Sequence, residues 1–156
     1  MTETADTSNV IIRPPIALAI AIVAGLAADW VYPWRFVPAS VPHAVIGGGL
    51  MAAGFALAIW AIVTMLKSGT RVETHKSSTT IVAAGPYRLS RNPIYIGMIL
   101  VEAGLAVTLN GLWLIIMLVP FWLVIRYGVI AREEAYLERK FGAVYLGYKS
   151  RTRRWL

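Results

Sequence analysis

The sequence contains no cysteine and only two histidines, His43 and His75. Without cysteine the chain forms no disulfide, carries no thiolate nucleophile and offers no sulfur ligand to a metal ion. Two histidines alone do not make a typical metal site, so we expect no metal centre.

Charged residues are also scarce, at 15% of the 156 residues, whereas hydrophobic residues make up 58%. A typical soluble domain has about 25% charged residues. The mean hydropathy of +0.64 points in the same direction. We therefore expect a single all-α membrane domain, because helices satisfy their own backbone hydrogen bonds in lipid.

Four apolar stretches are long enough for transmembrane helices, which need about 17 to 25 residues. We expect these spans at about 16–32, 43–66, 93–109 and 112–130, within one domain of residues 16–156. Residues 1–15 are predicted to be a disordered tail and residues 131–156 a cytoplasmic helix. Asn110-Gly111 interrupts an otherwise continuous apolar run, which predicts that the last two spans form a helical hairpin.

The second span carries a surface of small residues, which allows helix backbones to approach closely in lipid. These residues are Gly47, Gly48, Gly49, Ala52, Ala53, Gly54 and Ala56. Packing within the molecule is the simpler interpretation, and a homodimer seam is the alternative.

Basic residues are distributed very unevenly over the two sides of a four-span bundle. One side carries only Arg35. The other side carries Arg13, Lys67, Arg71, Lys76, Arg88, Arg91, Arg126, Arg132, Arg139, Lys140, Lys149, Arg151, Arg153 and Arg154. The positive-inside rule then places both termini and the loop of residues 67–92 in the cytoplasm. This placement explains the net charge of +7 by contact with membrane lipids, so we expect no nucleic-acid partner.

A polar loop leads directly into the third span. Gly85-Pro86 indicates a turn, Asn92 is a candidate helix cap, and Pro93 suits the first helical position. Free N–H groups at such a helix start favour anionic ligand groups. In a hairpin that turns between residues 110 and 111, Tyr95 lies level with Arg126, and Arg88 with Glu133. The polar loop and the polar stretch after the fourth span therefore meet at the cytoplasmic end of the bundle, which we call the mouth.

These stretches carry two motifs that resemble the family of isoprenylcysteine carboxyl methyltransferases and phospholipid methyltransferases. The first is Gly85-Pro-Tyr-Arg-Leu-Ser-Arg-Asn-Pro-Ile-Tyr-Ile-Gly97. The second is Glu133-Glu134-x-x-Leu137-x-x-x-Phe141-Gly142-x-x-Tyr145-x-x-Tyr148-Lys149. The resemblance covers residues 79–154.

The resemblance implies an integral membrane enzyme with S-adenosylmethionine as its cofactor, bound in a cytoplasmic pocket between the loop and the last helix. The family's cofactor-binding positions correspond to Thr79, Thr80, Ile81, Val82, Tyr87, Asn92, Pro93, Ile94, Tyr95 and Glu133. The acceptor is expected to be lipophilic, either a lipidated (prenylcysteine-like) carboxyl group or a lipid-like small molecule.

Two positions differ from the prenylcysteine enzymes. Asn92 stands where they have histidine, and Val129 stands where they have an arginine that serves the substrate carboxylate. Arg126 is about one helical turn from Val129 and is predicted to replace that arginine. Glu102 follows Tyr95 at helical spacing, and it either contacts the substrate or forms hydrogen bonds within the bundle. Glu73 and His75 are the loop candidates for a general base, should the acceptor need one.

Two other functions are compatible with the sequence. Sterol reductases have a similar C-terminal bundle that binds NADPH, although they are much longer. The chain could also be a non-catalytic membrane scaffold, for which the missing arginine is the best support.

Overall fold

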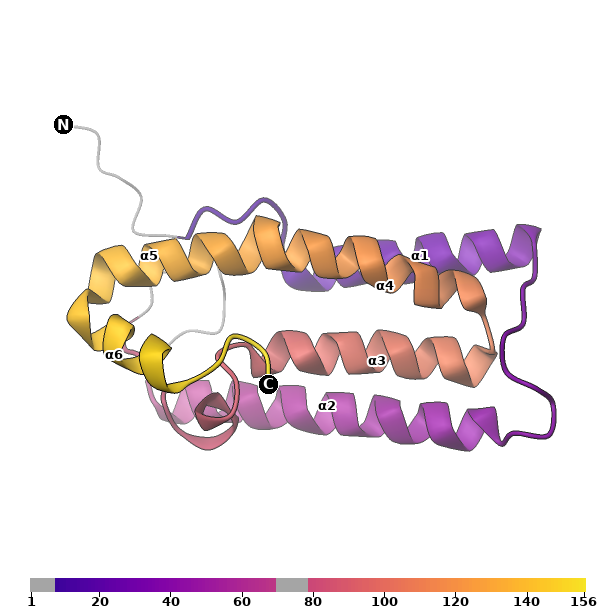
Figure 1. Ribbon diagram of the computed structural model, residues 1–156, viewed down its shortest axis with the longest axis horizontal. Coiled ribbons are helices and arrows are strands. Elements are labelled where there is room, and N and C mark those ends of the chain that lie inside the picture. The colour runs from indigo at the N-terminus through magenta and orange to yellow at the C-terminus, as the bar shows by residue number, and fades with distance from the viewer. Residues whose placement is uncertain (1–7, 70–78) are drawn as a thin grey trace.

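The computed structural model describes residues 8–69 and 79–156, and every regular element in these two ranges is a helix (Figure 1). In chain order the elements are α1 (Pro14–Val31), α2 (His43–Lys67), the 3-10 helix η1 (Gly85–Arg88), α3 (Pro93–Leu109), α4 (Leu112–Leu123), the π-helix η2 (Val124–Ile130), α5 (Ala131–Phe141) and α6 (Ala143–Arg151). The all-α prediction is confirmed.

Length and composition allow three of the described helices to cross a membrane. These are Pro14–Val31, His43–Lys67 and the continuous helix Leu112–Phe141. The remaining apolar helix, α3, has 17 residues. It rises about 25 Å at 1.5 Å per residue and lies antiparallel to α2 (Figure 1). The polytopic helical bundle is confirmed, with α3 at the short limit for a span.

Small residues bring α2 and α3 together. Gly47 and Gly54 are buried on α2, and Gly97 and Gly104 are buried on α3. A Cβ atom added to Gly54 would lie 2.7 Å from the carbonyl oxygen of Gly97, and one added to Gly104 would lie 2.7 Å from that of Gly47. Part of the small-residue surface therefore packs within the molecule. A homodimer through the part that stays exposed remains a prediction.

This close approach predicts a position-specific effect on stability. Gly54→Ala should lower the free energy of unfolding by about 1 to 3 kcal/mol, because the new methyl group meets backbone atoms that cannot move aside. Gly48→Ala on the same helix is the matched control, since a Cβ there meets nothing within 4 Å. Unfolding in detergent, followed by circular dichroism, measures both. Equal stabilities of the two variants would contradict the packing of this seam.

The turn between α3 and α4 also fixes the loop between α1 and α2. Asn110 adopts the left-handed conformation, with φ of 53°. Its Oδ1 accepts the N–H groups of Phe36 and Val37 at 3.0 and 2.8 Å, and its Nδ2 donates to the carbonyl of Val37 at 2.8 Å. Arg35 pairs with Asp29 at 2.9 Å in the same region. The predicted hairpin is confirmed, and it is tied to the first half of the bundle.

The last long helix changes from α-helical to π-helical geometry before it leaves the bundle. Pro120 lies inside α4, and the π-helix η2 follows it. The N–H group of Ile11 donates to the carbonyl of Gly128 in η2 at 3.1 Å. Val10 and Ile12 pack against the core formed by α1, α3, α4 and η2. The predicted tail of residues 1–15 is therefore packed where the structure describes it, from residue 8 onward.

The predicted C-terminal helix of residues 131–156 is in fact two helices. Gly142, with φ of 49°, separates α5 from α6. Because the left-handed region strongly favours glycine, the chain can reverse here. Figure 1 shows α5 extending past the start of α3 and α6 turning back towards η1. This return closes one end of the bundle.

Candidate active site

Two side chains join the two sequence motifs directly. The hydroxyl of Tyr95 on α3 donates to the carboxylate of Glu133 on α5, at 2.9 and 3.0 Å from its two oxygens. Tyr95 is 7% exposed. Side chains lean towards the N-terminus of their own helix, so in this antiparallel pair Tyr95 leans outward and Glu133 leans inward. The two side chains therefore meet, although the hairpin predicts different depths for the backbones of Tyr95 and Glu133.

The loop before α3 contributes a cluster of apolar side chains, which we call the apolar wall of the mouth. Val82 and Tyr87 are buried against Ala61 of α2, and Ile94 of α3 packs on the same cluster. Ile94 also packs on the main core, which contains Tyr95. Gly85 makes this fold of the loop possible, because it has φ of 55° and an added Cβ would lie 2.9 Å from the Thr64 hydroxyl.

The other loop positions that were predicted to bind the cofactor are more open. Thr79 and Thr80 are exposed and Ile81 is half-buried. The Thr79 hydroxyl donates to the carbonyl of Gly69 at 2.9 Å. Pro93 is buried at the first position of α3, as predicted.

Asn92 does not form the predicted side-chain helix cap. It stands at the helix start, but its side chain forms no cap hydrogen bond. Its Nδ2 donates instead to the carbonyl of Arg154 at 2.9 Å. The hydroxyl of Ser90 accepts the N–H of Asn92 at 3.1 Å and donates to the same carbonyl at 3.1 Å. The Asn92 side chain is thus held by a distant backbone carbonyl, and its oxygen accepts no N–H group of α3 as a cap.

That carbonyl belongs to residues 152–156, which we call the C-terminal strap. The strap runs beside the loop, and the N–H of Arg91 donates to the carbonyl of Arg153 at 2.9 Å. Thr152 is buried, and Trp155 packs against the core that contains Tyr95. The strap is therefore part of the mouth.

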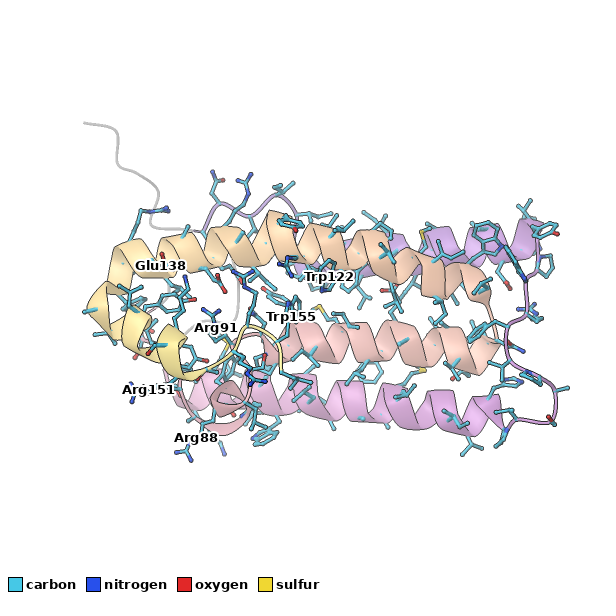
Figure 2. All side chains as sticks on the ribbon, viewed as in Figure 1. Arg88, Arg91, Trp122, Glu138, Arg151 and Trp155 are labelled. Carbon is cyan, nitrogen blue, oxygen red and sulfur yellow. The ribbon has the colours of Figure 1, made fainter. Side chains whose placement is uncertain are left out.

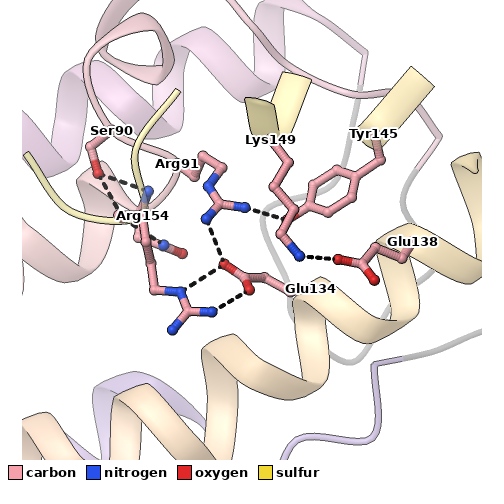
Figure 3. Close-up of polar contacts among 8 residues, drawn as sticks. Ser90, Arg91, Glu134, Glu138, Tyr145, Lys149 and Arg154 are labelled. Carbon is pink, nitrogen blue, oxygen red and sulfur yellow. Dashed lines mark hydrogen bonds and ion pairs between the residues drawn. The ribbon is translucent and has the colours of Figure 1, made fainter. Parts of the chain in front are cut away.

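A buried ion cluster holds the strap in place (Figure 3). Glu134 accepts hydrogen bonds from the Nε and NH2 atoms of Arg154 at 3.0 and 2.6 Å. The NH2 atom of Arg91 lies 3.3 Å from the same carboxylate. The side chains of Arg91 and Glu134 are each 9% exposed. Lys149 and Glu138 pair nearby, with more exposure to solvent.

Two phenols attach α6 to the loop. The Tyr148 hydroxyl donates to the carbonyl of Tyr87 at 2.8 Å, and the NH1 atom of Arg91 donates to the Tyr145 hydroxyl at 3.4 Å. Burial, followed by the negative charge of Glu134, raises the pKa of Tyr145 to about 12. Burial also raises the pKa of Tyr148. Both phenols are therefore neutral at physiological pH.

Comparison with known proteins identifies a protein family for this chain. The sequence profile described as phospholipid methyltransferase matches residues 42–144, which is more than half of the chain. The chain belongs to the phospholipid methyltransferase family. Membership supports a membrane methyltransferase in general terms. The match covers α2, the loop, the hairpin and α5, and it ends before most of α6 and the strap.

One curated relative of this chain is an uncharacterized protein of Haemophilus influenzae. The two are 61% identical over 36 residues, which are 23% of this chain and 57% of that protein. The chain thus matches only about half the length of this relative. No solved structure matches the chain.

Of the three residues predicted for catalysis, the structure describes Glu102 and Arg126. Glu102 is fully buried in α3, and neither carboxylate oxygen has a hydrogen-bond partner among the described residues. Arg126 lies in η2, with its guanidinium over the rings of Trp122 and Tyr127. His75 lies outside the described residues, as does Glu73. Val129 is a fully buried core residue.

Several residues of the mouth were not among the predicted catalytic and cofactor-binding residues. Arg91, Glu134, Tyr145 and Tyr148 stand within the two phospholipid methyltransferase motifs, so the motifs themselves were the signal for them. Arg154 and Trp155 had no such signal. The loop binds the strap through backbone carbonyl groups, which any residue type can supply.

Proposed function

We propose that this chain transfers a methyl group from S-adenosylmethionine to a lipophilic acceptor at the mouth formed by α3, α5 and the loop. The observation that carries this proposal is the Tyr95–Glu133 pair, which fixes a carboxylate between the two family motifs. The family membership supports the methyl transfer in general, and the pair supports the position of the cofactor.

The side chains at the mouth suit this cofactor chemically. The carboxylate of Glu133 can accept hydrogen bonds from an ammonium group or from ribose hydroxyls. The apolar wall of Val82, Tyr87 and Ile94 suits the face of an adenine ring. Neighbouring acids do not compete for these groups, because Glu134 is engaged with Arg91 and Arg154.

The bound cofactor supplies an electrophilic methyl group, and the protein's task is to align the acceptor and to exclude water. Tyr95 orients Glu133, and the ion cluster holds the strap beside the loop. Arg126 and Glu102 are the predicted acceptor contacts among the described residues, and His75 is the predicted base outside them. A lipophilic acceptor suits a site at the end of an apolar bundle.

We place this mouth on the cytoplasmic side, with both termini. The excess of basic residues in the loop and in residues 131–156 supports this orientation. In Figure 1 the C-terminal residues lie at the same end of the bundle as η1, which agrees with a single basic side.

Calorimetric titration of the detergent-purified protein tests the proposed function. We expect saturable binding of S-adenosylhomocysteine and no saturable binding of NADPH. Binding of NADPH alone would move the protein to the reductases. Binding of neither would support a scaffold without turnover.

A further inference from the structure

Four exposed side chains lie on the outside of the mouth, and we call this surface the outer face. They are Arg88 and Leu89 of the loop, Arg151 at the end of α6 and Arg153 of the strap. Figure 2 shows Arg88 and Arg151 pointing away from the helices on the same side of the molecule. Three arginines and an exposed leucine at one end of a membrane bundle indicate a surface that meets an anionic and partly apolar partner.

Backbone carbonyl groups hold the two halves of the outer face together. The Tyr148 hydroxyl on α6 donates to the carbonyl of Tyr87, the residue before Arg88. The N–H of Arg91 donates to the carbonyl of Arg153 at 2.9 Å. The same segments therefore present buried side chains to the mouth and exposed side chains to its surroundings.

The packing of η1 on α2 gives the depth of the outer face relative to the membrane. A Cβ atom added to Gly85, at the start of η1, would lie 2.9 Å from the Thr64 hydroxyl and 3.3 Å from the Trp60 indole nitrogen. Both residues belong to the last turns of α2, which is long and apolar enough to cross a membrane and ends at Lys67. Trp60 is 51% exposed, and tryptophan is typical of the lipid–water boundary. The outer face therefore begins at the level of the lipid headgroups.

The acidic side chains in residues 8–69 and 79–156 are engaged or buried elsewhere. Four of these five acids accept hydrogen bonds from other side chains, and they are Asp29, Glu133, Glu134 and Glu138. The fifth, Glu102, is fully buried in α3. In the described part of the chain no ion pair joins an acid to an arginine of the outer face. These arginines are therefore available to an anion from outside the chain.

Apolar side chains beside the arginines distinguish a lipid leaflet from a soluble anion. Leu89 is 65% exposed, and Val144 is 67% exposed about two turns before Arg151 on the same side of α6. A soluble phosphate ion gains nothing from such side chains. A leaflet buries them at the boundary between headgroups and acyl chains, while the arginines stay among the headgroups.

We propose that the outer face binds the anionic headgroups of lipids in the leaflet beside the mouth, with Leu89 inserted between them. The forked donors of arginine match the oxygens of a phosphate group. A lipid bound there contacts the loop and the strap together, and it therefore holds the two segments in place from outside the mouth. This inference goes beyond the proposed function and does not depend on it.

Two short-chain lipids and one soluble anion test the outer face on the full-length protein. They are dioctanoyl phosphatidylglycerol, dioctanoyl phosphatidylcholine and inorganic phosphate, and calorimetry in a neutral detergent measures their dissociation constants. We expect phosphatidylglycerol to bind at least about 10-fold more tightly than phosphatidylcholine, because each arginine near an anionic lipid contributes about 5-fold. The preference should decrease as salt is added, since the arginines are exposed.

Substitutions with a matched control locate the binding surface. Arg88→Gln, Arg151→Gln and Arg153→Gln should each weaken phosphatidylglycerol binding by about 5-fold, and the triple variant by about 100-fold. Arg139→Gln is the control and should leave binding unchanged, because Arg139 is exposed near the end of α5, which extends past the start of α3 (Figure 1). Leu89→Ala should weaken the binding of both lipids by about 4-fold for each CH₂ group that the leaflet no longer buries.

Unfolding of every variant in neutral detergent shows whether the fold is intact, and the midpoints should equal that of the wild type because all the changed side chains are exposed. Equal affinity for the two lipids would overturn the inference, and so would an equal loss of affinity in Arg139→Gln and Arg88→Gln. Inorganic phosphate that binds as tightly as phosphatidylglycerol, or unchanged lipid affinity in Leu89→Ala, would show a site for a soluble anion instead of a leaflet.

Discussion

Replacing Glu133 with glutamine should weaken the binding of S-adenosylhomocysteine by about 30- to 1,000-fold. A charge-assisted hydrogen bond is typically stronger than a neutral one by about 1 to 2 kcal/mol, and we expect two such bonds. Glutamine has the same shape and keeps an oxygen for the Tyr95 hydroxyl. Glu133 is also only partly buried. The fold should therefore survive, and the effect should appear in the dissociation constant measured by calorimetry.

Tyr95→Phe separates positioning from direct contact. Phenylalanine keeps the buried ring but no longer orients the carboxylate, so we expect a smaller loss, of about 5-fold, in line with one ordinary hydrogen bond. Glu138→Gln is the matched control on the same helix, since Glu138 pairs with Lys149. The assignment of the cofactor site would be wrong if Glu133→Gln and Glu138→Gln bound S-adenosylhomocysteine with the same affinity.

Substitution of Glu134, the next residue in the chain, should affect the stability of the fold. Glu134→Ala should reduce the free energy of unfolding by about 3 to 5 kcal/mol, the usual loss when one partner of a buried ion pair is removed. The Arg91 side chain, only 9% exposed, would remain charged and unpaired inside the mouth. Unfolding in detergent measures this loss directly.

Two controls show whether the ion cluster is the cause. Glu138→Ala removes a pair that is 37% and 36% exposed, so it should change stability by at most about 1 kcal/mol. Arg154→Ala combined with Glu134→Ala should destabilise less than the sum of the single variants, because both remove the same interaction. Additive losses would mean that Glu134 stabilises the fold by another contact.

The sequence predicted the elements that depend on local composition. Long apolar runs defined the helices, and Asn110-Gly111 defined the turn, because few other residues adopt its backbone conformation. That turn also brought the two motifs to one mouth. The meeting of Tyr95 with Glu133 follows from this geometry together with the lean of side chains on antiparallel helices.

The sequence did not predict how the mouth is closed. Asn92 had the right type and position for a helix cap, but its side chain forms no cap hydrogen bond and its Nδ2 donates to the carbonyl of Arg154. Gly142 looked like part of a motif rather than a break between helices. At Asn92 the partner of the side chain is remote in sequence, and no short pattern shows where such a partner lies.

The strap also has a consequence for biosynthesis. Asn92 and Arg154 are 62 positions apart, and the backbone partners of the loop follow all four apolar helices in chain order. These helices can therefore leave the ribosome before the contacts exist. The bundle can assemble first, while the mouth acquires its final shape only once residues 152–156 have been translated. A nascent chain held in the membrane at this stage would have its helices in place but an unfinished active site.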